Sequence, residues 1–258
     1  MIKYLVIIQA RCGSSRLPSK VLKEIEGKTA LEQMLGRVSM SKKIDEIIVA
    51  TTIEVEDIPI VNLVSGLGYR VFVGSSGDVL DRYYQAARLV QPEYIIRLTA
   101  DCPLFDWRVL DEAIDVLQPE TDDLAMISET FPDGQDIEIL RFSVLKKMWE
   151  SAGLPSEREH VTQYVRNHKE QFVLQDFVCR LGNLNNERWT LDEADDLTMV
   201  RAVYNHFAPR TDFSMEEIYA YLQTHPEVRS INQGYIRNEG LLKSLAHDKA
   251  MDWQSHDF

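Results

Sequence analysis

The chain has 258 residues, 45% of them hydrophobic and 27% charged, which suffices for one large α/β domain whose core needs no disulfide bridges. Its formal net charge of −13 argues against nucleic acid as a partner, because such binding depends on clustered Lys and Arg. No apolar run of membrane-spanning length and no cleavable signal pattern occurs, so we expect a cytoplasmic protein that does not bind a membrane.

Short apolar runs rich in β-branched residues alternate with amphipathic segments in the first half of the chain. Such runs are typical of buried parallel strands, and the alternation predicts right-handed crossovers in a mostly parallel sheet flanked by helices. The predicted strands are 4–9, 46–51, 69–73 and 94–98. The predicted helices are 29–39, 57–66 and 78–90.

The second half is less regular. A predicted helix at 106–117 is followed by strands at 124–127 and 136–140, which we expect to form a small sub-sheet for an acceptor site or for dimerisation. The remaining predicted elements are helices at 142–150, 157–167, 194–206 and 215–223 and strands at 172–178 and 188–191. We therefore expect a single domain over 1–230 and a polar tail over 231–258 whose order the pattern does not define.

The loop after the first predicted strand is suited to binding a polyphosphate. It contains one glycine that allows close backbone approach, two hydroxyls and three cations: Gly13, Ser14, Ser15, Arg11, Arg16 and Lys20. Neither the dinucleotide fingerprint nor the Walker spacing is present. Nucleotide binding is favoured because open α/β sheets bind ligands at the carboxyl ends of their strands, although a basic surface turn has the same composition.

A second pattern occurs at residues 97–104, where a predicted strand continues into Arg-Leu-Thr-Ala-Asp-Cys-Pro-Leu. Pro103 restricts Cys102 to extended geometry, which lets Asp101 direct its carboxylate into the crevice. Mg²⁺ uses such a hard oxygen ligand beside a triphosphate, so Asp101 is a candidate metal ligand. The alternative is an aspartate that caps the helix starting near Asp106.

A third pattern occurs at residues 187–197, where another predicted strand ends in Asp192 and a helix follows. Asp192 as N-cap, with Asp195 near the third helical position, explains the local sequence. The functional alternative is that Asp192 and Asp101 converge from two strand ends on one metal ion.

Five segments, in this order, resemble the cytidylyltransferase family of spore-coat polysaccharide biosynthesis proteins. They are residues 9–20, 97–104, 133–138 (Asp-Gly-x-Asp-x-Glu), 157–162 (Glu-Arg-Glu-His-Val-Thr) and 189–192 (Trp-Thr-Leu-Asp). The resemblance covers residues 1–205 and extends, more distantly, to the CMP-sialic acid and CMP-Kdo synthetases. It implies a Rossmann-like nucleotidyltransferase fold, with a nucleotide-binding part at about 1–120 and an acceptor-side part at about 121–190. It further implies a homodimer that transfers CMP from CTP to an acidic sugar or a sugar or polyol phosphate, releasing pyrophosphate.

The resemblance also implies roles for individual residues. Asp101 and Asp192 match the Mg²⁺ ligands, and Ser75 and Ser76 lie where relatives contact the base and ribose. Thr190 replaces the first acid of the Asp-x-Asp pair of sialic acid synthetases, which leaves open whether one or two metals bind. The residues expected to bind the CTP phosphates are Arg11, Ser14, Arg16 and Lys20, and those expected to act in catalysis are Lys20, Arg16 and Asp101.

An anionic acceptor needs a cation of its own, for which Arg158, His160 and Arg188 are candidates, although each also suits a surface ion pair or a helix contact. The polar residues near the 131–134 turn are candidates for binding sugar hydroxyls or abstracting the attacking proton, although a solvated hairpin edge explains them as well. They are Asp133, Gln135, Asp136 and Glu138. A metal-dependent glycosyltransferase of related fold and a nucleotide-binding regulator without turnover remain alternative functions.

Overall fold

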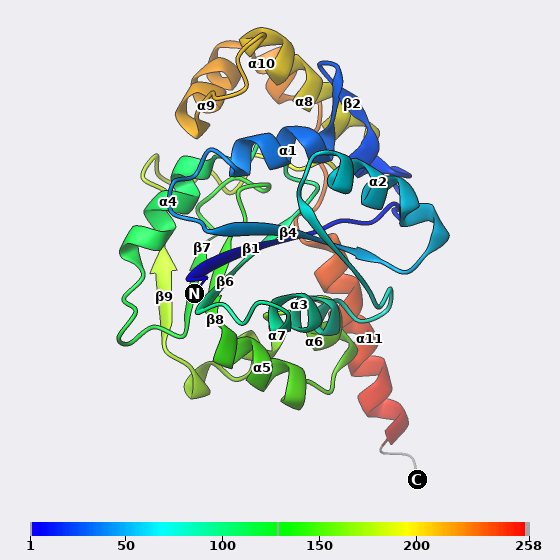
Figure 1. Cartoon of the computed structure of the whole chain (residues 1–258). Coiled ribbons are helices and arrows are strands. Elements are labelled where there is room, and N and C mark those ends of the chain that lie inside the picture. The colour runs from blue at the N-terminus through cyan, green and yellow to red at the C-terminus, as the bar shows by residue number, and fades with distance from the viewer. Residues whose placement is uncertain (1, 128, 256–258) are drawn as a thin grey trace.

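Strand β1 (Tyr4–Gln9) is buried on both faces, with Val6 and Ile8 in one hydrophobic cluster and Leu5 and Ile7 in another. Helices therefore cover the sheet on both sides, as a continuous apolar run predicts. The computed structural model describes residues 2–127 and 129–255 (Figure 1). Its main sheet has the strand order β5 (Arg70–Gly74), β4 (Glu46–Thr52), β1, β6 (Tyr94–Thr99), β8 (Glu138–Arg141), β7 (Leu124–Ile127) and β9 (Leu174–Phe177).

Strand direction decides which loops share an edge of this sheet. Strands β5, β4, β1 and β6 run parallel to one another, whereas β8 is antiparallel to both β6 and β7. The last strand, β9, is parallel to β7. Because β8 runs in the opposite direction, the turn that precedes it lies at the same edge as the carboxyl ends of β1 and β6.

Two layers of helices enclose the sheet (Figure 1). One layer contains α1 (Ala30–Val38), α2 (Ile58–Gly66), α4 (Trp107–Val116), α8 (Ala194–Phe207), α9 (Met215–Thr224) and α10 (Pro226–Arg229). The other contains α3 (Val79–Arg88), α5 (Phe142–Ser151), α6 (Pro155–Glu159) and α7 (Gln163–Asn167), and α11 (Glu239–Ser255) packs against α6. Among the helices of the described residues, none has the length and apolar character needed to cross a bilayer.

Short elements complete the chain. A two-stranded antiparallel sheet, which the sequence pattern did not predict, pairs β2 (Glu24–Ile25) with β3 (Lys28–Thr29). Single turns of 3-10 helix occur at Lys20–Leu22, Val55–Asp57 and Lys169–Gln171. The α/β class with a mostly parallel, helix-flanked sheet is confirmed, and the predicted strands of the first half agree with β1, β4, β5 and β6 to within one residue at each end.

The structure corrects three expectations about the second half and defines the order of the tail, which the sequence leaves open. The strands at 124–127 and 136–140 belong to the main sheet as β7 and β8, not to a separate sub-sheet. The helix expected over 157–167 is split into α6 and α7, because Val161 has a φ of 41° and the Thr162 hydroxyl donates to the buried Glu138 carboxylate. The tail is helical over Glu239–Ser255, and residues 256–258 lie outside the described part.

The third correction concerns the strand expected at 188–191. This segment forms a single bridge, Asp133 to Arg188, instead of a strand. Its backbone N–H groups form hydrogen bonds with two different loops. Trp189 N–H donates to the Asp133 carbonyl at 2.7 Å, and Leu191 N–H donates to the Asp101 carbonyl at 2.7 Å. The segment therefore joins two turns at the site edge.

Candidate active site

The buried Asp57 carboxylate anchors the loop after β1, residues 10–20. Asp57 accepts hydrogen bonds from the backbone N–H of Cys12 at 2.6 Å and from the hydroxyls of Thr51 and Thr52 at 3.0 and 2.5 Å. Burial opposes the charged form, but these donors outweigh it and lower the pKa of Asp57. A Cβ placed on Gly13 would meet no atom within 4 Å, so the space beside this loop is open.

Lys20 joins this loop to two distant carboxylates. Its Nζ lies 2.6 Å from Asp101 Oδ2 and 2.5 Å from Asp192 Oδ1. Burial disfavours the ammonium ion, but the two carboxylates outweigh it and raise the pKa of Lys20. Burial likewise opposes the charged form of Asp101, yet the Lys20 ammonium holds the pKa of that carboxyl below its usual range. The structure thus brings Asp101 and Asp192 to one cation.

Backbone pairing explains why Asp192 reaches Asp101. Leu191 N–H donates to the Asp101 carbonyl, and the Thr190 hydroxyl donates to the same oxygen at 3.2 Å. A Cβ on Gly134, whose φ is 102°, would lie 2.7 Å from the backbone carbon of Trp189. Only glycine allows this close approach, which brings the turn before β8 against the segment that carries Asp192.

Neither aspartate serves as the helix cap that the sequence allowed. Asp106 caps α4, since its carboxylate accepts a hydrogen bond from Arg108 N–H at 3.0 Å. At the start of α8 the buried Asp196 carboxylate accepts the N–H groups of Asp192 and Glu193, both at 2.8 Å. The carboxylates of Asp101 and Asp192 are therefore directed toward Lys20.

The two arginines of the loop after β1 pair with carboxylates in different places, Arg16 near Lys20 and Arg11 on α6. Arg16 forms ion pairs with Asp192 at 3.1 Å and with Glu193 at 3.3 Å, so it lies beside Lys20. Arg11 is half-exposed and pairs with Glu159 of α6 at 3.3 Å. Ser14 accepts the N–H of Leu17 at 3.3 Å within the loop, and Ser15 is exposed.

Ser75 and Ser76 follow β5 at the same edge of the sheet. The Ser75 hydroxyl accepts the N–H of Asp78 at 3.1 Å, and its carbonyl accepts a hydrogen bond from Arg82 at 3.0 Å. Both serines are partly buried. They lie two strands from β1 in the sheet order, so contact with a nucleotide base stays a prediction.

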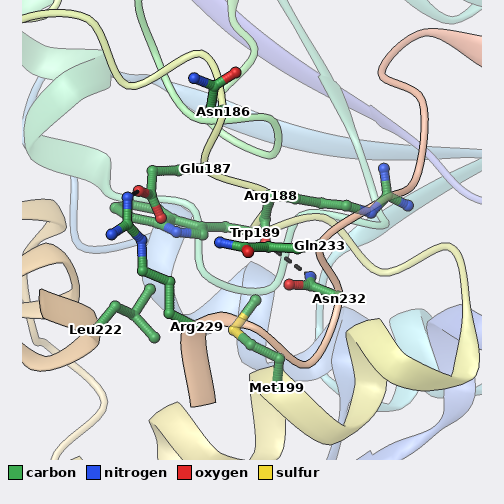
Figure 2. A pocket seen from close by; sticks show the side chains of 9 residues that line it. All are labelled: Asn186, Glu187, Arg188, Trp189, Met199, Leu222, Arg229, Asn232 and Gln233. Atoms are coloured by element: carbon green, nitrogen blue, oxygen red, sulfur yellow. Dashed lines mark hydrogen bonds and ion pairs between the residues drawn. The ribbon is translucent and has the colours of Figure 1, made fainter. Parts of the chain in front are cut away.

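A second charged group is centred on Arg188, whose guanidinium lies 3.6 Å from the Asp192 carboxylate. Arg188 donates two hydrogen bonds to Asp196, both 2.8 Å long, and one to Asp133, 3.1 Å long. Figure 2 shows its guanidinium extending away from a small pocket lined by Glu187, Trp189 and Arg229, while Asn232 donates to its carbonyl. Arg188 therefore holds the turn and the start of α8 together.

The turn carries two close carboxylates. Burial is the main cause that raises the pKa of Asp133 to about 7, and the neighbouring Asp136 carboxylate adds to it, although Arg188 and Arg237 act in the opposite direction. Asp136 is half-exposed and accepts a hydrogen bond from Arg237 at 3.2 Å. Asp133, Asp136 and Arg188 thus form one polar group at the site edge.

The structure contradicts two of the acceptor-binding expectations. Gln135 is fully buried, and its amide donates to the Leu104 carbonyl at 2.9 Å and accepts from Asp106 N–H at 3.0 Å. Glu138 is also buried and pairs with Arg97 at 2.7 Å and Arg166 at 3.1 Å. Because both side chains form hydrogen bonds or ion pairs inside the protein, neither is available to bind an acceptor.

Two further acceptor candidates are engaged elsewhere. The Arg158 guanidinium donates to the Asp78 carboxylate through two nitrogens and to the Trp149 carbonyl at 2.9 Å, which ties α6 to α3 and α5. His160 Nε2 lies 3.0 Å from the Ser244 hydroxyl of α11, and burial lowers its pKa. These contacts explain both residues as links between helices.

Sequence reasoning missed three residues that shape this edge. Asp57 was expected only as the start of a helix, yet it anchors the first loop. Arg237 and Glu239 fall in the tail of undefined order, but they contact Asp136 and Arg16 at 3.2 and 3.1 Å. No local pattern could have found these contacts, because the partners are more than 100 residues apart in the chain.

Comparison with known proteins agrees with this architecture. Residues 5–219 match the family described as cytidylyltransferase. Spore coat polysaccharide biosynthesis protein SpsF of Bacillus subtilis is 33% identical over 230 residues, which cover 86% of this chain and 95% of SpsF. A 3-deoxy-manno-octulosonate cytidylyltransferase of Thermodesulfovibrio yellowstonii is 28% identical over 50% of this chain and 53% of its own length. The solved structure of a cytidylyltransferase from Leptospira borgpetersenii has a TM-score of 0.85 at 31% identity and covers 92% of this chain and 100% of that chain.

Proposed function

The chain belongs to the cytidylyltransferase family and is thus a nucleotidyltransferase, and we propose that it transfers CMP from CTP to an acidic sugar or a sugar or polyol phosphate. The observation that carries this proposal is the position of Lys20, whose Nζ lies within 2.6 Å of both Asp101 and Asp192. This contact joins the predicted phosphate loop to two acids that lie 91 residues apart in sequence. Such a centre suits a triphosphate bound together with a divalent cation.

The reaction is an in-line displacement at phosphorus. An acceptor oxygen forms a bond to the α-phosphorus of CTP as the bond to the bridging oxygen breaks, and pyrophosphate leaves with the electron pair. Lys20 and Arg16 lie where they can stabilise the charge that develops on the leaving pyrophosphate, and the open space beside Gly13 leaves room for the phosphates. The acceptor proton passes to the solvent or to a nearby carboxylate.

The carboxylates fit a divalent metal. Side chains of Asp101 and Asp192 keep 24% and 19% of their surface exposed and share the Lys20 ammonium, and Asp192 also pairs with Arg16 at 3.1 Å and with Arg188 at 3.6 Å. Mg²⁺ is bound in proteins by one or two carboxylates together with substrate phosphates and water, so Asp101 and Asp192 would hold it. When bound, Mg²⁺ supplies charge neutralisation at the phosphate oxygens. In the described part of the chain no group of three or more His, Cys, Asp or Glu side chains is placed to hold a metal ion.

The names of relatives support the acceptor class. SpsF is named for spore coat polysaccharide biosynthesis, and the Thermodesulfovibrio enzyme is named for 3-deoxy-manno-octulosonate, an acidic sugar. Membership in a nucleotidyltransferase family argues against the glycosyltransferase alternative, and turnover would exclude the regulator. A cytoplasmic homodimer with a nucleotide-binding part at about 1–120 and an acceptor-side part at about 121–190 completes the proposal.

Pyrophosphate release tests this function. The purified protein is incubated with Mg²⁺, each of the four nucleoside triphosphates and a panel of acidic sugars and polyol phosphates. We expect pyrophosphate with CTP and at least one anionic acceptor, and loss of that release in Asp101→Asn. Release of a nucleoside diphosphate from a sugar nucleotide would instead support a glycosyltransferase, and CTP binding with no release from any pair would support a regulator.

A further inference from the structure

A segment beyond the family match contacts the site on three sides. Residues 235–239 lie beyond Tyr219, the last residue matched by the family, and end at Glu239, which begins α11. The Tyr235 ring lies 5.3 Å from the Arg188 guanidinium, and its hydroxyl donates to Asp195 at 2.9 Å. Arg237 donates to the Phe131 carbonyl at 2.9 Å and to Asp136 at 3.2 Å. The segment therefore begins beside the turn that carries Asp133 and Asp136, which we call the polar turn, and continues toward the loop after β1.

The third contact is with the phosphate loop itself. Glu239, the first residue of α11, forms an ion pair with Arg16 at 3.1 Å. Because Arg16 also pairs with Asp192, the segment 235–239 ends beside the carboxylates assigned to the metal. Arg237 is thus placed between the polar turn and the reacting centre.

Arg158, Arg188 and Arg237 differ in how many of their N–H groups donate hydrogen bonds to buried or partly buried carboxylates. Arg158 and Arg188 each direct two nitrogens at one carboxylate, and Arg188 uses its third nitrogen on Asp133. Among the residues that the structure describes, Arg237 donates two hydrogen bonds, one of them to a carboxylate that is 51% exposed. A guanidinium has more donors than these two, and its carboxylate partner Asp136 is half-exposed, with its other oxygen accepting the Gly134 N–H at 3.1 Å. Arg237 can therefore accept a new anionic partner without breaking a buried pair.

The carbonyl contact orients this guanidinium. Phe131 is buried beside the turn that carries Asp133, and its carbonyl holds one nitrogen of Arg237. A guanidinium held at one nitrogen can present its remaining N–H groups as a planar fork, which matches a carboxylate or a phosphate. The hydroxyl-binding candidates Asp133 and Asp136 lie next to it, so an anionic sugar would find both kinds of partner at one place.

We propose that Arg237 binds the anionic group of the acceptor and that residues 235–239 form the acceptor-side wall of the site. This inference rests on the proposed cytidylyl transfer and names the chain's own cation for the acceptor. The anion is a carboxylate or a phosphate ester, since both have the oxygen spacing that a guanidinium fork recognises. The cations predicted from the sequence, Arg158, His160 and Arg188, act instead as structural links.

The test separates acceptor binding from nucleotide binding. The full chain, with Mg²⁺ and CTP, is assayed for pyrophosphate with 3-deoxy-manno-octulosonate, with glycerol 3-phosphate, and with mannose and glycerol as neutral counterparts. KM for the best acceptor and KM for CTP are then measured in Arg237→Ala and Arg237→Lys. The matched control is Arg210→Ala, which removes an exposed arginine paired with Asp212 and Glu217.

We expect turnover with an anionic acceptor, an increase in its KM of at least about tenfold in Arg237→Ala, and KM for CTP within about twofold of wild type. Arg237→Lys should recover part of the loss, because it keeps the charge but not the fork, and Arg210→Ala should match wild type. Unchanged acceptor KM in Arg237→Ala would overturn this inference while leaving cytidylyl transfer intact, and so would turnover with neutral acceptors alone. Wild-type protein without turnover on any acceptor would overturn both.

Discussion

Replacing Lys20 with methionine removes the cation shared by two partly buried carboxylates. The substitution keeps a side chain of similar length and leaves Asp101 and Asp192 facing each other, with Arg16 still 3.1 Å from Asp192. Leaving a buried charge without its partner costs about 3–5 kcal/mol. Because these carboxylates keep 24% and 19% exposure, solvent screening reduces this cost, and we expect about 2–3 kcal/mol.

Two measurements follow from this estimate. For a chain of this size each kcal/mol changes Tm by about 2–4 °C, so Lys20→Met should melt about 5–10 °C below wild type at pH 7. Mg²⁺ alone should recover part of this loss, since the metal can replace the ammonium between the carboxylates. Pyrophosphate release should fall at least about 100-fold, as expected for lost stabilisation of the leaving group.

The control is Lys146→Met, which removes an exposed lysine paired with Glu150 on α5 at 3.8 Å and should change neither quantity. The low pKa of Asp101 gives a further check. A carboxyl whose pKa is lowered on folding stabilises the protein above its unfolded pKa, and this contribution is lost as pH falls through the folded value. The Tm gap should therefore narrow below about pH 4. Wild-type turnover in Lys20→Met, or an unchanged Tm with no response to Mg²⁺, would refute the reasoning.

Three other predictions concern the same edge of the sheet. Asp101→Asn and Asp192→Asn should each lower pyrophosphate release at least about 100-fold and weaken the activation by Mg²⁺; activation equal to wild type would contradict the metal assignment. Glu239→Gln removes one of the carboxylates that compete with phosphate for Arg16, beside Asp192 and Glu193, and should lower KM for CTP about two- to fivefold, an effect that high salt should abolish. The charged groups that act on Asp133 are Asp136, Asp101, Arg188 and Arg237. Its pKa of about 7 means that folding favours the neutral carboxyl. The stabilisation that this carboxyl contributes to the folded state is therefore complete below about pH 4 and is lost as pH rises through 7. Asp133→Asn should therefore melt at least about 2–4 °C above wild type at pH 8 and close to it below about pH 4, and the opposite trend would show that the pair with Arg188 dominates.

The sequence pattern predicted the strands of the first half and their parallel arrangement, because each strand is marked by its own apolar run. The apolar runs that become β1 and β6 must be buried on both faces, and parallel strands place their following loops at one edge. This is why Lys20 and Asp101 could be assigned to the same site before any coordinates were known. The sequence allows Asp192 either to cap a helix or to converge with Asp101, and the structure brings both carboxylates to Lys20.

The features that the sequence did not predict depend on distant partners. The break between α6 and α7 occurs because Thr162 donates to Glu138, 24 residues away in the chain. The segment at 188–191 has the composition of a strand but pairs with two turns. Arg237 looks like a residue of a polar tail until its contacts with the Phe131 carbonyl and Asp136 are known. Periodicity contains no information about such contacts.

The central claim is that the first loop and the carboxylates of Asp101 and Asp192 form one site for CTP and a divalent metal. Crystals of the full chain grown with CTP and Mn²⁺, and measured at the manganese absorption edge, test this directly. The account predicts an anomalous peak between the two carboxylates and the triphosphate, with Lys20 and Arg16 on the phosphates. A triphosphate bound away from the 10–20 loop, or a peak that neither aspartate contacts, would contradict it.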